Sequence, residues 1–453
     1  MATPQPNALL EHLRQVLTDV VNAQKLKHPH ILIALSGGLD STVLIHALAK
    51  LQAELSFTLS AAHVNHGLSK QADAWAEFCA NLCFSLNISL QIHRVTVDKN
   101  SGLGVEAAAR AVRYAALYTA QNSVDAHFIC LAHHQNDQAE TLLLQLARGA
   151  GVKGLAGMAV KDVERKLLRP LLDCSRVQLE AYAKQQQLRW VEDDSNSDTQ
   201  YDRNFMRRDV LPVLQQRYPA ITQTLSRTAA HLAEASTLLD ALAQLDAVNC
   251  INHKQQSLHI NMLHLLGAER QANVMRWWLA SMQIAMPSTQ QMQQILQQLL
   301  HAKSDSAVKL KVAESQYLRR YQGSAYLVGE CEELPPINLL WQGEEVIPLP
   351  NHSRLIFTKQ MGAGLAFQRG GSDIKLRIKN RQGGERFKPD LARPSRTLKV
   401  IMQSSDMPPW QREQLPLIFM DETLAMIPNV GVDAHLKAES HEMGLQVAWE
   451  QVT

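Results

Sequence analysis

The chain is 453 residues long, 46% of them hydrophobic, and its formal net charge is +2 at pH 7. This length predicts two or three domains with a core in each, and the near-neutral balance means that a nucleic-acid partner has to be argued from local charge clusters. No segment resembles a signal core or a membrane span, and the six cysteines form no C-x-x-C pair, so we expect a cytoplasmic protein with reduced thiols and no membrane contact.

Apolar runs alternate with amphipathic stretches in the first part of the chain. We predict strands at 31–35, 57–64, 88–97 and 128–132, and helices at 42–51, 72–86, 105–121 and 137–148. This order is typical of a parallel sheet with helices on its faces. Such sheets bind ligands at the carboxyl ends of their strands, so we expect the loops after the first, second and fourth strands to converge on one crevice.

The rest of the sequence predicts two further domains. Residues 220–302 are rich in Gln, Leu and Ala and read as helical, whereas strands are expected from Ala307 onward, with Pro335 and Pro336 marking a linker. The fold class is therefore α/β with a parallel sheet, followed by a helical domain and a small α+β domain. The predicted domains are 1–217, 218–332 and 333–453.

The most informative motif is the turn SGGLDS after the first predicted strand. Two glycines let backbone N–H groups turn toward an anion, hydroxyls add donors, and the following helix points its positive dipole end at the same place. Asp40 would repel a phosphate unless a cation lies between them, so we expect Mg²⁺ at this carboxylate. No lysine follows the glycines, so the turn differs from the common NTPase loop. The predicted phosphate-binding residues are Ser36, Gly37, Gly38, Leu39, Asp40 and Ser41.

Two histidines, His63 and His66, lie at the end of the second predicted strand. A metal site is one interpretation, but no nearby carboxylate or cysteine completes a ligand set. A loop histidine can equally hydrogen-bond to phosphate or adenine, or serve a structural role. Of the two, we predict His66 as the site residue.

The charges of Glu106, Arg110 and Arg113 share one face of a predicted helix. Glu106 and Arg110 have the spacing of an ordinary i, i+4 ion pair. Alternatively, the two arginines hold phosphate or an RNA backbone through bidentate contacts. The residue pattern leaves both interpretations open.

His134, Asp137 and Glu140 lie at the predicted start of the helix at 137–148. Two carboxylates on one face need a cation, and Mg²⁺ or a substrate ammonium would satisfy them. The alternative is an exposed acidic first turn that complements the helix dipole. We favour a site because this loop should emerge beside the SGGLDS turn.

Two more segments carry glycines or charge. The glycines at 149–157, with Arg148 and Lys153, follow a helix and not a strand, so they predict either a mobile loop that closes over substrate or a linker that ends the helix. Between Lys375 and Lys399 nine Lys or Arg stand against two acids. That cluster is either a solvated basic face or a surface that contacts a phosphate backbone.

The SGGLDS turn after a buried strand resembles the fingerprint of the PP-loop ATP pyrophosphatases, which attack the α-phosphate of ATP and release pyrophosphate. A series of motifs then narrows this resemblance to the bacterial tRNA(Ile)-lysidine synthases. The motifs are SGGLDS, HVNHGLS, GVEAAARAVRY, HHQNDQAETLLLQLARGAGVKGLAGM, RPLL, DSNSDTQYDRNFMRRDVLP and, near the carboxyl end, KNRQGGERFKP. Asn65 departs from the pattern, since a histidine is common at that position.

The resemblance implies that free L-lysine is joined to the wobble cytidine of an isoleucine tRNA bearing a CAU anticodon. The cytidine is first adenylated by ATP with Mg²⁺, and the lysidine product changes codon reading from AUG to AUA. It implies catalytic roles for Asp40, Asp137 and Glu140, and no obligate protein partner. It also assigns ATP binding to His66 and the turn, substrate binding to Arg110, Arg113, His134, Arg148, Arg203, Asn204 and Arg207, and tRNA binding to Arg381, Arg386 and Lys388.

Three rival functions share some of these features. An RNA thiolase usually has cysteine pairs, and this chain has none. A glutamine-dependent synthetase would need a nucleophilic cysteine in an amino-terminal amidase domain, yet residue 2 is Ala. A noncatalytic, nucleotide-gated RNA-binding protein would not need Asp40, Asp137 and Glu140, and it would release no pyrophosphate.

Overall fold

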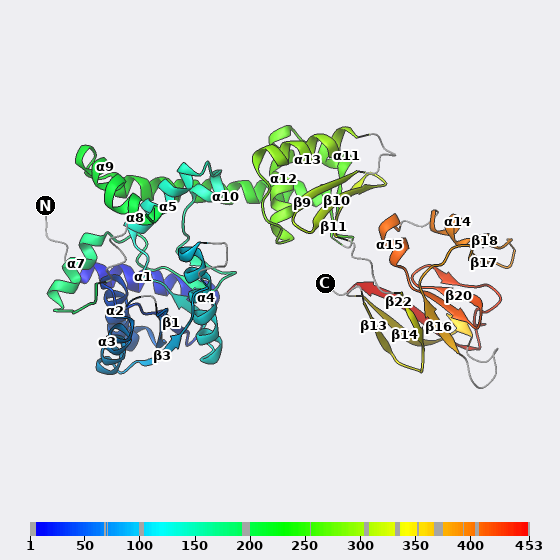
Figure 1. Ribbon diagram of the computed structural model, residues 1–453, viewed down its shortest axis with the longest axis horizontal. Helices are drawn as coiled ribbons and strands as arrows, with labels where there is room; N and C mark the ends of the chain where they lie inside the picture. The colour runs from blue at the N-terminus through cyan, green and yellow to red at the C-terminus, as the bar shows by residue number, and fades with distance from the viewer. Residues whose placement is uncertain are drawn as a thin grey trace. The chain divides into compact units, whose positions relative to one another are not determined.

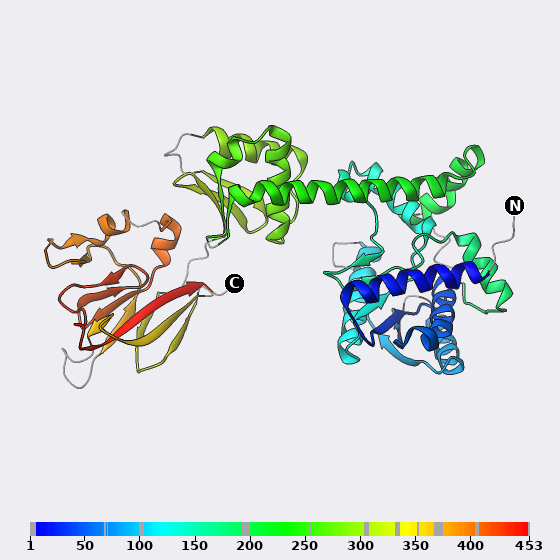
Figure 2. The same ribbon diagram turned by 180° about the vertical axis from the view of Figure 1, so that it is seen from behind.

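The structure, a computed structural model, describes residues 6–67, 69, 71–98, 104–192, 200–253, 255–302, 308–330, 336–350, 353–366, 375–392, 394–403 and 407–451. The chain divides into two compact units, Met1–Leu242 and Ala243–Thr453. The domain boundaries expected after residues 217 and 332 stay predictions. Figures 1 and 2 show the two units from opposite sides.

The first unit is built on a six-stranded sheet in the order β3-β2-β1-β4-β6-β5. Every pairing is parallel except that of β5 with β6, which confirms the predicted parallel sheet. The strands are β1 His30–Ala34, β2 Thr58–Asn65, β3 Ser89–Arg94, β4 Phe128–Cys130, β5 Lys161–Asp162 and β6 Leu167–Leu168. The helices are α1 Pro6–Gln24, α2 Leu39–Leu55, α3 Ala72–Ser85, α4 Val105–Ser123, α5 Gln135–Ala147, α6 Val152–Leu155, α7 Arg176–Gln185, α8 Asp202–Phe205 and α9 Leu211–Arg217, with a π-helical turn η2 Met206–Val210.

Side chains alternate between the two faces of this sheet, as the strand period requires. From β1, Ile31 and Ile33 join the core made with α1, α2, α3 and α7. Leu32, between them, joins a second core under α4. Figure 2 shows α1 lying along the sheet. Because helices cover both faces, loops at the carboxyl ends of the strands remain the open place for a site.

The second unit holds a helical and sheet region followed by a β-rich region. α10 Ile221–Cys250 leads into it, and the helices α11 Ile260–His264, α12 Ala268–Ser281 and α13 Thr289–His301 share a core with a five-stranded antiparallel sheet. That sheet has the order β7-β8-β11-β10-β9, formed by β7 Ile251–Asn252, β8 Ser257–His259, β9 Lys309–Ala313, β10 Gln316–Tyr321 and β11 Ser324–Gly329. β7 and β8 lie in the span predicted as helical. They pair with each other, and β8 joins the sheet through β11, which comes much later in the sequence.

The β-rich region packs two antiparallel sheets around one core, in the orders β12-β16-β19-β20-β21 and β13-β14-β22-β15. This confirms the expected α+β carboxyl-terminal fold. Its strands are β12 Asn338–Leu340, β13 Val346–Leu349, β14 Ser353–Met361, β15 Leu365–Ala366, β16 Leu376–Lys379, β17 Arg386–Phe387, β18 Arg396–Thr397, β19 Leu417–Met420, β20 Thr423–Ile427, β21 Gly431–Val432 and β22 Met443–Gln451, with helices α14 Leu398–Gln403 and α15 Pro409–Gln414.

Five cysteines lie in the described part of the chain, and all five are buried free thiols. Burial raises the pKa of Cys79 to about 12 and that of Cys83 to about 11, so both remain protonated packing groups. None of the helices in the described ranges has the length and hydropathy needed to cross a membrane.

Candidate active site

The SGGLDS turn connects β1 to α2 and has a backbone that only glycine adopts easily. Gly37 has φ +87°, and a Cβ there would lie 3.0 Å from Cγ2 of Val191 and 3.2 Å from Sγ of Cys79. Gly38 is extended and caps α2. A side chain at Gly37 would therefore meet both backbone strain and crowding.

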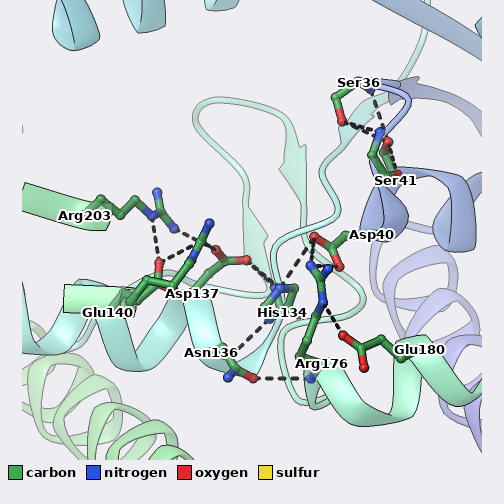
Figure 3. Close-up of polar contacts among 12 residues, drawn as sticks. Ser36, Asp40, Ser41, His134, Asn136, Asp137, Glu140, Arg176, Glu180 and Arg203 are labelled. Carbon is green, nitrogen blue, oxygen red and sulfur yellow. Dashed lines mark hydrogen bonds and ion pairs between the residues drawn. The ribbon is translucent and has the colours of Figure 1, made fainter. Parts of the chain in front are cut away.

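The donors of this turn gather on the hydroxyl of Ser41 (Figure 3). The N–H groups of Ser36 and Gly37 each donate to Ser41 Oγ at 3.2 Å. Ser41 Oγ in turn donates to the carbonyl oxygen of Gly38 at 3.1 Å. Inward-facing amides at the start of a helix form the standard arrangement for binding phosphate.

Asp40, in the first turn of α2, contacts Arg176, which none of the sequence motifs singled out. Nη1 of Arg176 lies 3.0 Å from each carboxylate oxygen of Asp40, and Nε of Arg176 donates to Glu180 at 3.1 Å. The side chain of Asp40 is 27% exposed. This carboxylate therefore already has a positive partner within the chain.

His134 joins Asp40 to the start of α5. The ring Nδ1 of His134 accepts the backbone N–H of Asn136 at 3.2 Å, and the backbone N–H of His134 donates to the Asp137 carboxylate at 2.9 Å. Together these contacts form a reciprocal cap of the helix. Nε2 of His134 lies 3.6 Å from an oxygen of Asp40 and 3.6 Å from an oxygen of Asp137. Burial lowers the pKa of His134, but the two carboxylates outweigh burial and raise it above its usual value.

Asp137 and Glu140 are neutralised by two arginines. Nε of Arg203, on α8, donates to Glu140 and Nη2 to Asp137, both at 3.1 Å. Nε and Nη2 of Arg207, on η2, donate to Glu140 at 2.6 and 2.9 Å, and Nη2 also reaches Asp137 at 3.0 Å. The side chain of Glu140 is only 1% exposed. The residue pattern predicted Mg²⁺ or an ammonium as the cation here, whereas the structure places guanidinium groups beside these carboxylates, and the acidic turn is not exposed.

The pKa of Asp137 lies below its usual range. Burial would raise this pKa, but the charges of His134 and Arg203 and the N–H of His134 outweigh it. Asp137 therefore stays ionised at neutral pH and stabilises the arginine cluster.

Other predicted residues lie on neighbouring elements. Nε of Arg113 is 3.2 Å from Nε2 of His66, and burial together with Arg113 lowers the pKa of His66 to about 4. Arg110 donates to the hydroxyl of Tyr114 at 3.3 Å and not to a carboxylate in any contact described. The side chain of Glu106 lies outside the described residues. Arg148 pairs with Asp202 at 3.3 Å on the surface.

The glycine segment after α5 is anchored to that helix. The side-chain amide of Gln138 donates to the carbonyl oxygen of Met158 at 2.9 Å and accepts its N–H at 2.8 Å. Gly157 has φ +66°, and a Cβ there would lie 2.6 Å from Gln138 Oε1. The short helix α6 lies within the segment. The closure of this segment over substrate stays a prediction.

The basic residues predicted from the carboxyl-terminal segment belong to the second unit. Nε of Arg381 is 3.9 Å from Glu385, while Arg386 donates to Ser395 through Nε and Nη2 at 3.1 and 2.8 Å. Lys388 contributes its backbone N–H to Asp433 at 3.0 Å. The structure thus uses part of this positive charge within the region itself.

Two functional candidates next to the site, Arg169 and His133, were not predicted. Arg169 is buried, and its Nε lies 3.3 Å from Nδ1 of His133. Burial, reinforced by nearby arginines, lowers the pKa of His133 to about 3. The RPLL and HHQND motifs contain these two residues, but a contact between residues 36 positions apart cannot be read from either motif.

The partly buried His133 should make stability depend on pH. In the unfolded chain its pKa is near 6.5, so the unfolded state binds more protons between pH 6.5 and about 3. Its contribution is full above pH 6.5 and is lost as the pH falls through this window. His133→Asn removes this titrating group. Between pH 6.5 and about 3 its unfolding free energy should therefore fall less steeply with decreasing pH than that of the parent, by up to about 1.4 kcal/mol per pH unit. Urea unfolding at pH 5 and pH 7.5 measures this.

The control for this measurement is His231→Asn, because that ring is 68% exposed. It should leave the pH profile unchanged. A His133→Asn profile that runs parallel to the parent between pH 5 and 7.5 would show that the ring is not held neutral.

Three family models match the chain. A PP-loop domain covers residues 9–214, a TilS substrate binding domain covers 258–326, and a TilS substrate C-terminal domain covers 376–449.

Curated relatives match over most of the chain. The tRNA(Ile)-lysidine synthase of Nitrosomonas europaea is 38% identical, with 95% of this chain and 93% of that protein covered. Its namesake from Coxiella burnetii is 39% identical over 92% of both chains. The protein of the same name from Proteus mirabilis is 36% identical, with 96% of this chain and 98% of that one covered.

Proposed function

Because the chain belongs to the tRNA(Ile)-lysidine synthase family, it is a ligase that forms lysidine on tRNA(Ile) with ATP as a substrate, and we propose how its residues divide this work. One observation carries the proposal. Asp40 of the phosphate turn and Asp137 of α5 both lie beside His134, and Asp137 shares two arginines with Glu140 (Figure 3). Nucleotide, base and amine would therefore meet at the carboxyl ends of the strands, and we expect the reaction to run in the cytoplasm.

We assign the first step to the SGGLDS turn. O2 of the wobble cytidine attacks the α-phosphorus of ATP, the bond to the bridging oxygen breaks, and pyrophosphate leaves. The N–H groups of Ser36 and Gly37, which donate to Ser41 Oγ in this structure, would exchange that hydroxyl for phosphate oxygens and, with the start of α2, stabilise the negative charge that develops there. His66 would bind the nucleotide from the β2 loop, beside Arg110 and Arg113.

Asp40 fits the role of a Mg²⁺ ligand. Mg²⁺ beside nucleotides is usually held by one or two carboxylates, phosphate oxygens and water. The carboxylate of Asp40 stands in the phosphate turn and is 27% exposed, although it contacts Arg176, whereas the carboxylates of Asp137 and Glu140 are 10% and 1% exposed. Among the residues that the structure describes, no cluster of three His, Cys, Asp or Glu makes a cage for a metal. An ion bound with the nucleotide would supply positive charge against the phosphates.

We assign lysine binding to Asp137 and Glu140 of α5, the two acids that Arg203 and Arg207 hold in this structure. Arg203 and Arg207, with side chains 25% and 39% exposed, would turn toward the adenylate phosphate or tRNA, with help from Asn204 and Arg148. Asp137 and Glu140 would then be left with negative charge, which the lysine ammonium satisfies. The arginines thus act as partners that the substrates exchange.

The second step breaks the bond between the adenylated oxygen and C2 of the ring. The lysine side-chain nitrogen attacks C2, AMP leaves with that oxygen, and the ammonium has to lose protons on the way. Asp137 is a weak base because its pKa is low. Asp137 also accepts the backbone N–H of His134 in the cap of α5, so of the two acids we give the proton-acceptor role to Glu140.

The basic carboxyl-terminal region would bind tRNA through its phosphates. We expect Arg381→Gln and Lys388→Gln each to weaken tRNA binding several-fold, and each to reduce by about one the slope of log affinity against log salt concentration. Filter binding between 50 and 200 mM salt measures this. KM for lysine should not change, because the lysine site belongs to the other unit.

A salt slope equal to the parent value in both variants would remove these residues from the tRNA interface. The matched control is Lys50→Gln, which neutralises a basic residue of α2 that donates to Gln186.

The overall proposal is tested with purified protein, ATP, Mg²⁺, labelled lysine and an isoleucine tRNA transcript carrying CAU. Label should enter this transcript and not a matched one with another wobble base, and AMP should appear in equal amount. Good tRNA binding without incorporation would overturn the assignment of lysine as the amine.

A further inference from the structure

Arg176 has a backbone position that is fixed with respect to the site. It is the first residue of α7, whose start is capped by Ser175 and Gln178 through reciprocal hydrogen bonds. The N–H of Arg176 donates to the side chain of Asn136 at 3.2 Å, in the first turn of α5. The start of α7 is thereby tied to the helix that carries His134 and Asp137.

The side chain of Arg176 is less constrained than its backbone. Nη1 alone makes both contacts to Asp40, so this pair lacks the two-nitrogen fork of a strong arginine–carboxylate interaction. The side chain is 41% exposed, and Nε holds Glu180 independently at 3.1 Å. Loss of Asp40 would leave the guanidinium anchored beside the phosphate turn (Figure 3).

We infer that Arg176 is a phosphate-binding residue that holds Asp40 until the nucleotide arrives. This inference rests on the proposed role of Asp40 as a Mg²⁺ ligand. Arg176 and a metal ion compete for the same two oxygens, and a phosphate oxygen near Asp40 gives Nη1 a new anionic partner at the same place. Arg176 thus neutralises the carboxylate of the turn before binding and the phosphates after it.

The test measures binding of a non-cleavable ATP analogue, α,β-methylene-ATP, by calorimetry across a Mg²⁺ titration. Without the competing guanidinium, Arg176→Gln should need several-fold less Mg²⁺ for half-maximal binding. At saturating Mg²⁺ its affinity for the analogue should fall about tenfold, since one charge-assisted contact is lost. Arg176→Lys keeps the positive charge, so its Mg²⁺ midpoint and its affinity should lie between those of the parent and Arg176→Gln. This intermediate result would show that the effect in the glutamine variant is not a folding defect.

The matched control is Arg14→Gln, an arginine whose side chain is 34% exposed and which contacts Glu54 at 2.8 Å. It should leave both measurements unchanged. An Arg176→Gln protein with the parent affinity, or with the parent Mg²⁺ midpoint, overturns the inference. Asp40→Asn tests the metal ligand separately: parent-like Mg²⁺ dependence in that variant would overturn the proposed metal site, whatever Arg176→Gln shows.

Discussion

Asp40→Asn should lower the rate of AMP formation roughly 10³-fold, because several kcal/mol of transition-state charge stabilisation depend on this carboxylate. The folded state should change little, since the contact between Asp40 and Arg176 is partly exposed and such pairs contribute about 0–1 kcal/mol. Single-turnover assays with excess enzyme and saturating lysine measure the rate. Thermal unfolding of the same samples shows whether the protein is intact.

The control for Asp40→Asn is Glu54→Gln, which also removes a carboxylate from an arginine pair on α2. It should keep the parent rate. An Asp40→Asn enzyme within tenfold of the parent would mean that the turn binds ATP without a carboxylate-held cation.

Glu140→Gln should impair both stability and catalysis. Its side chain is 1% exposed and accepts hydrogen bonds from Arg203 and Arg207, so removing the charge leaves two guanidinium groups short of a partner. We expect a loss of roughly 3 kcal/mol of unfolding free energy, at the low end for a broken buried pair because the arginines can reach water. Lysidine formation should fall about 10²-fold or more at saturating lysine. Urea unfolding and the label incorporation assay measure the two effects.

A double substitution separates the two effects. Glu140→Gln combined with Arg207→Gln restores charge balance and should recover part of the lost stability, but not lysidine formation. Recovery of turnover together with stability would show that Glu140 only supports the fold. Asp246→Asn is the matched control outside the site, because Asp246 is a buried acid held by Arg270. It should reduce stability and leave turnover at low temperature unchanged.

The sequence predicted the parallel sheet and the meeting of two loops at one of its edges because both follow from local patterns. The alternation of apolar and amphipathic segments determines the order of strands and helices, and Gly37 requires a turn with positive φ. Parallel strands then bring the SGGLDS turn and the His133–Asp137 loop to one edge. These conclusions needed no knowledge of contacts between distant side chains.

The partners of the carboxylates were not predicted, because they depend on such distant contacts. Asp40 and Arg176 are 136 positions apart, and Arg207 is 67 positions from Glu140. The pattern Ser175 to Gln178 indicates a helix start but not which acid lies in front of it. The sequence therefore predicted that negative charge at the site needs a cation, and it pointed to Mg²⁺ or a substrate ammonium where the structure places arginines.

The five buried thiols give the enzyme a built-in set of reporters. Cys79, Cys83, Cys130 and Cys174 lie in the first unit and Cys250 in the second. A protonated, inaccessible thiol reacts with an alkylating reagent only while its surroundings open, so the labelling rate of each cysteine measures the free energy of local opening. Because Cys79 lies directly behind Gly37, its protection should rise when nucleotide occupies the turn. Mass spectrometry of native-state alkylation would then follow substrate binding residue by residue.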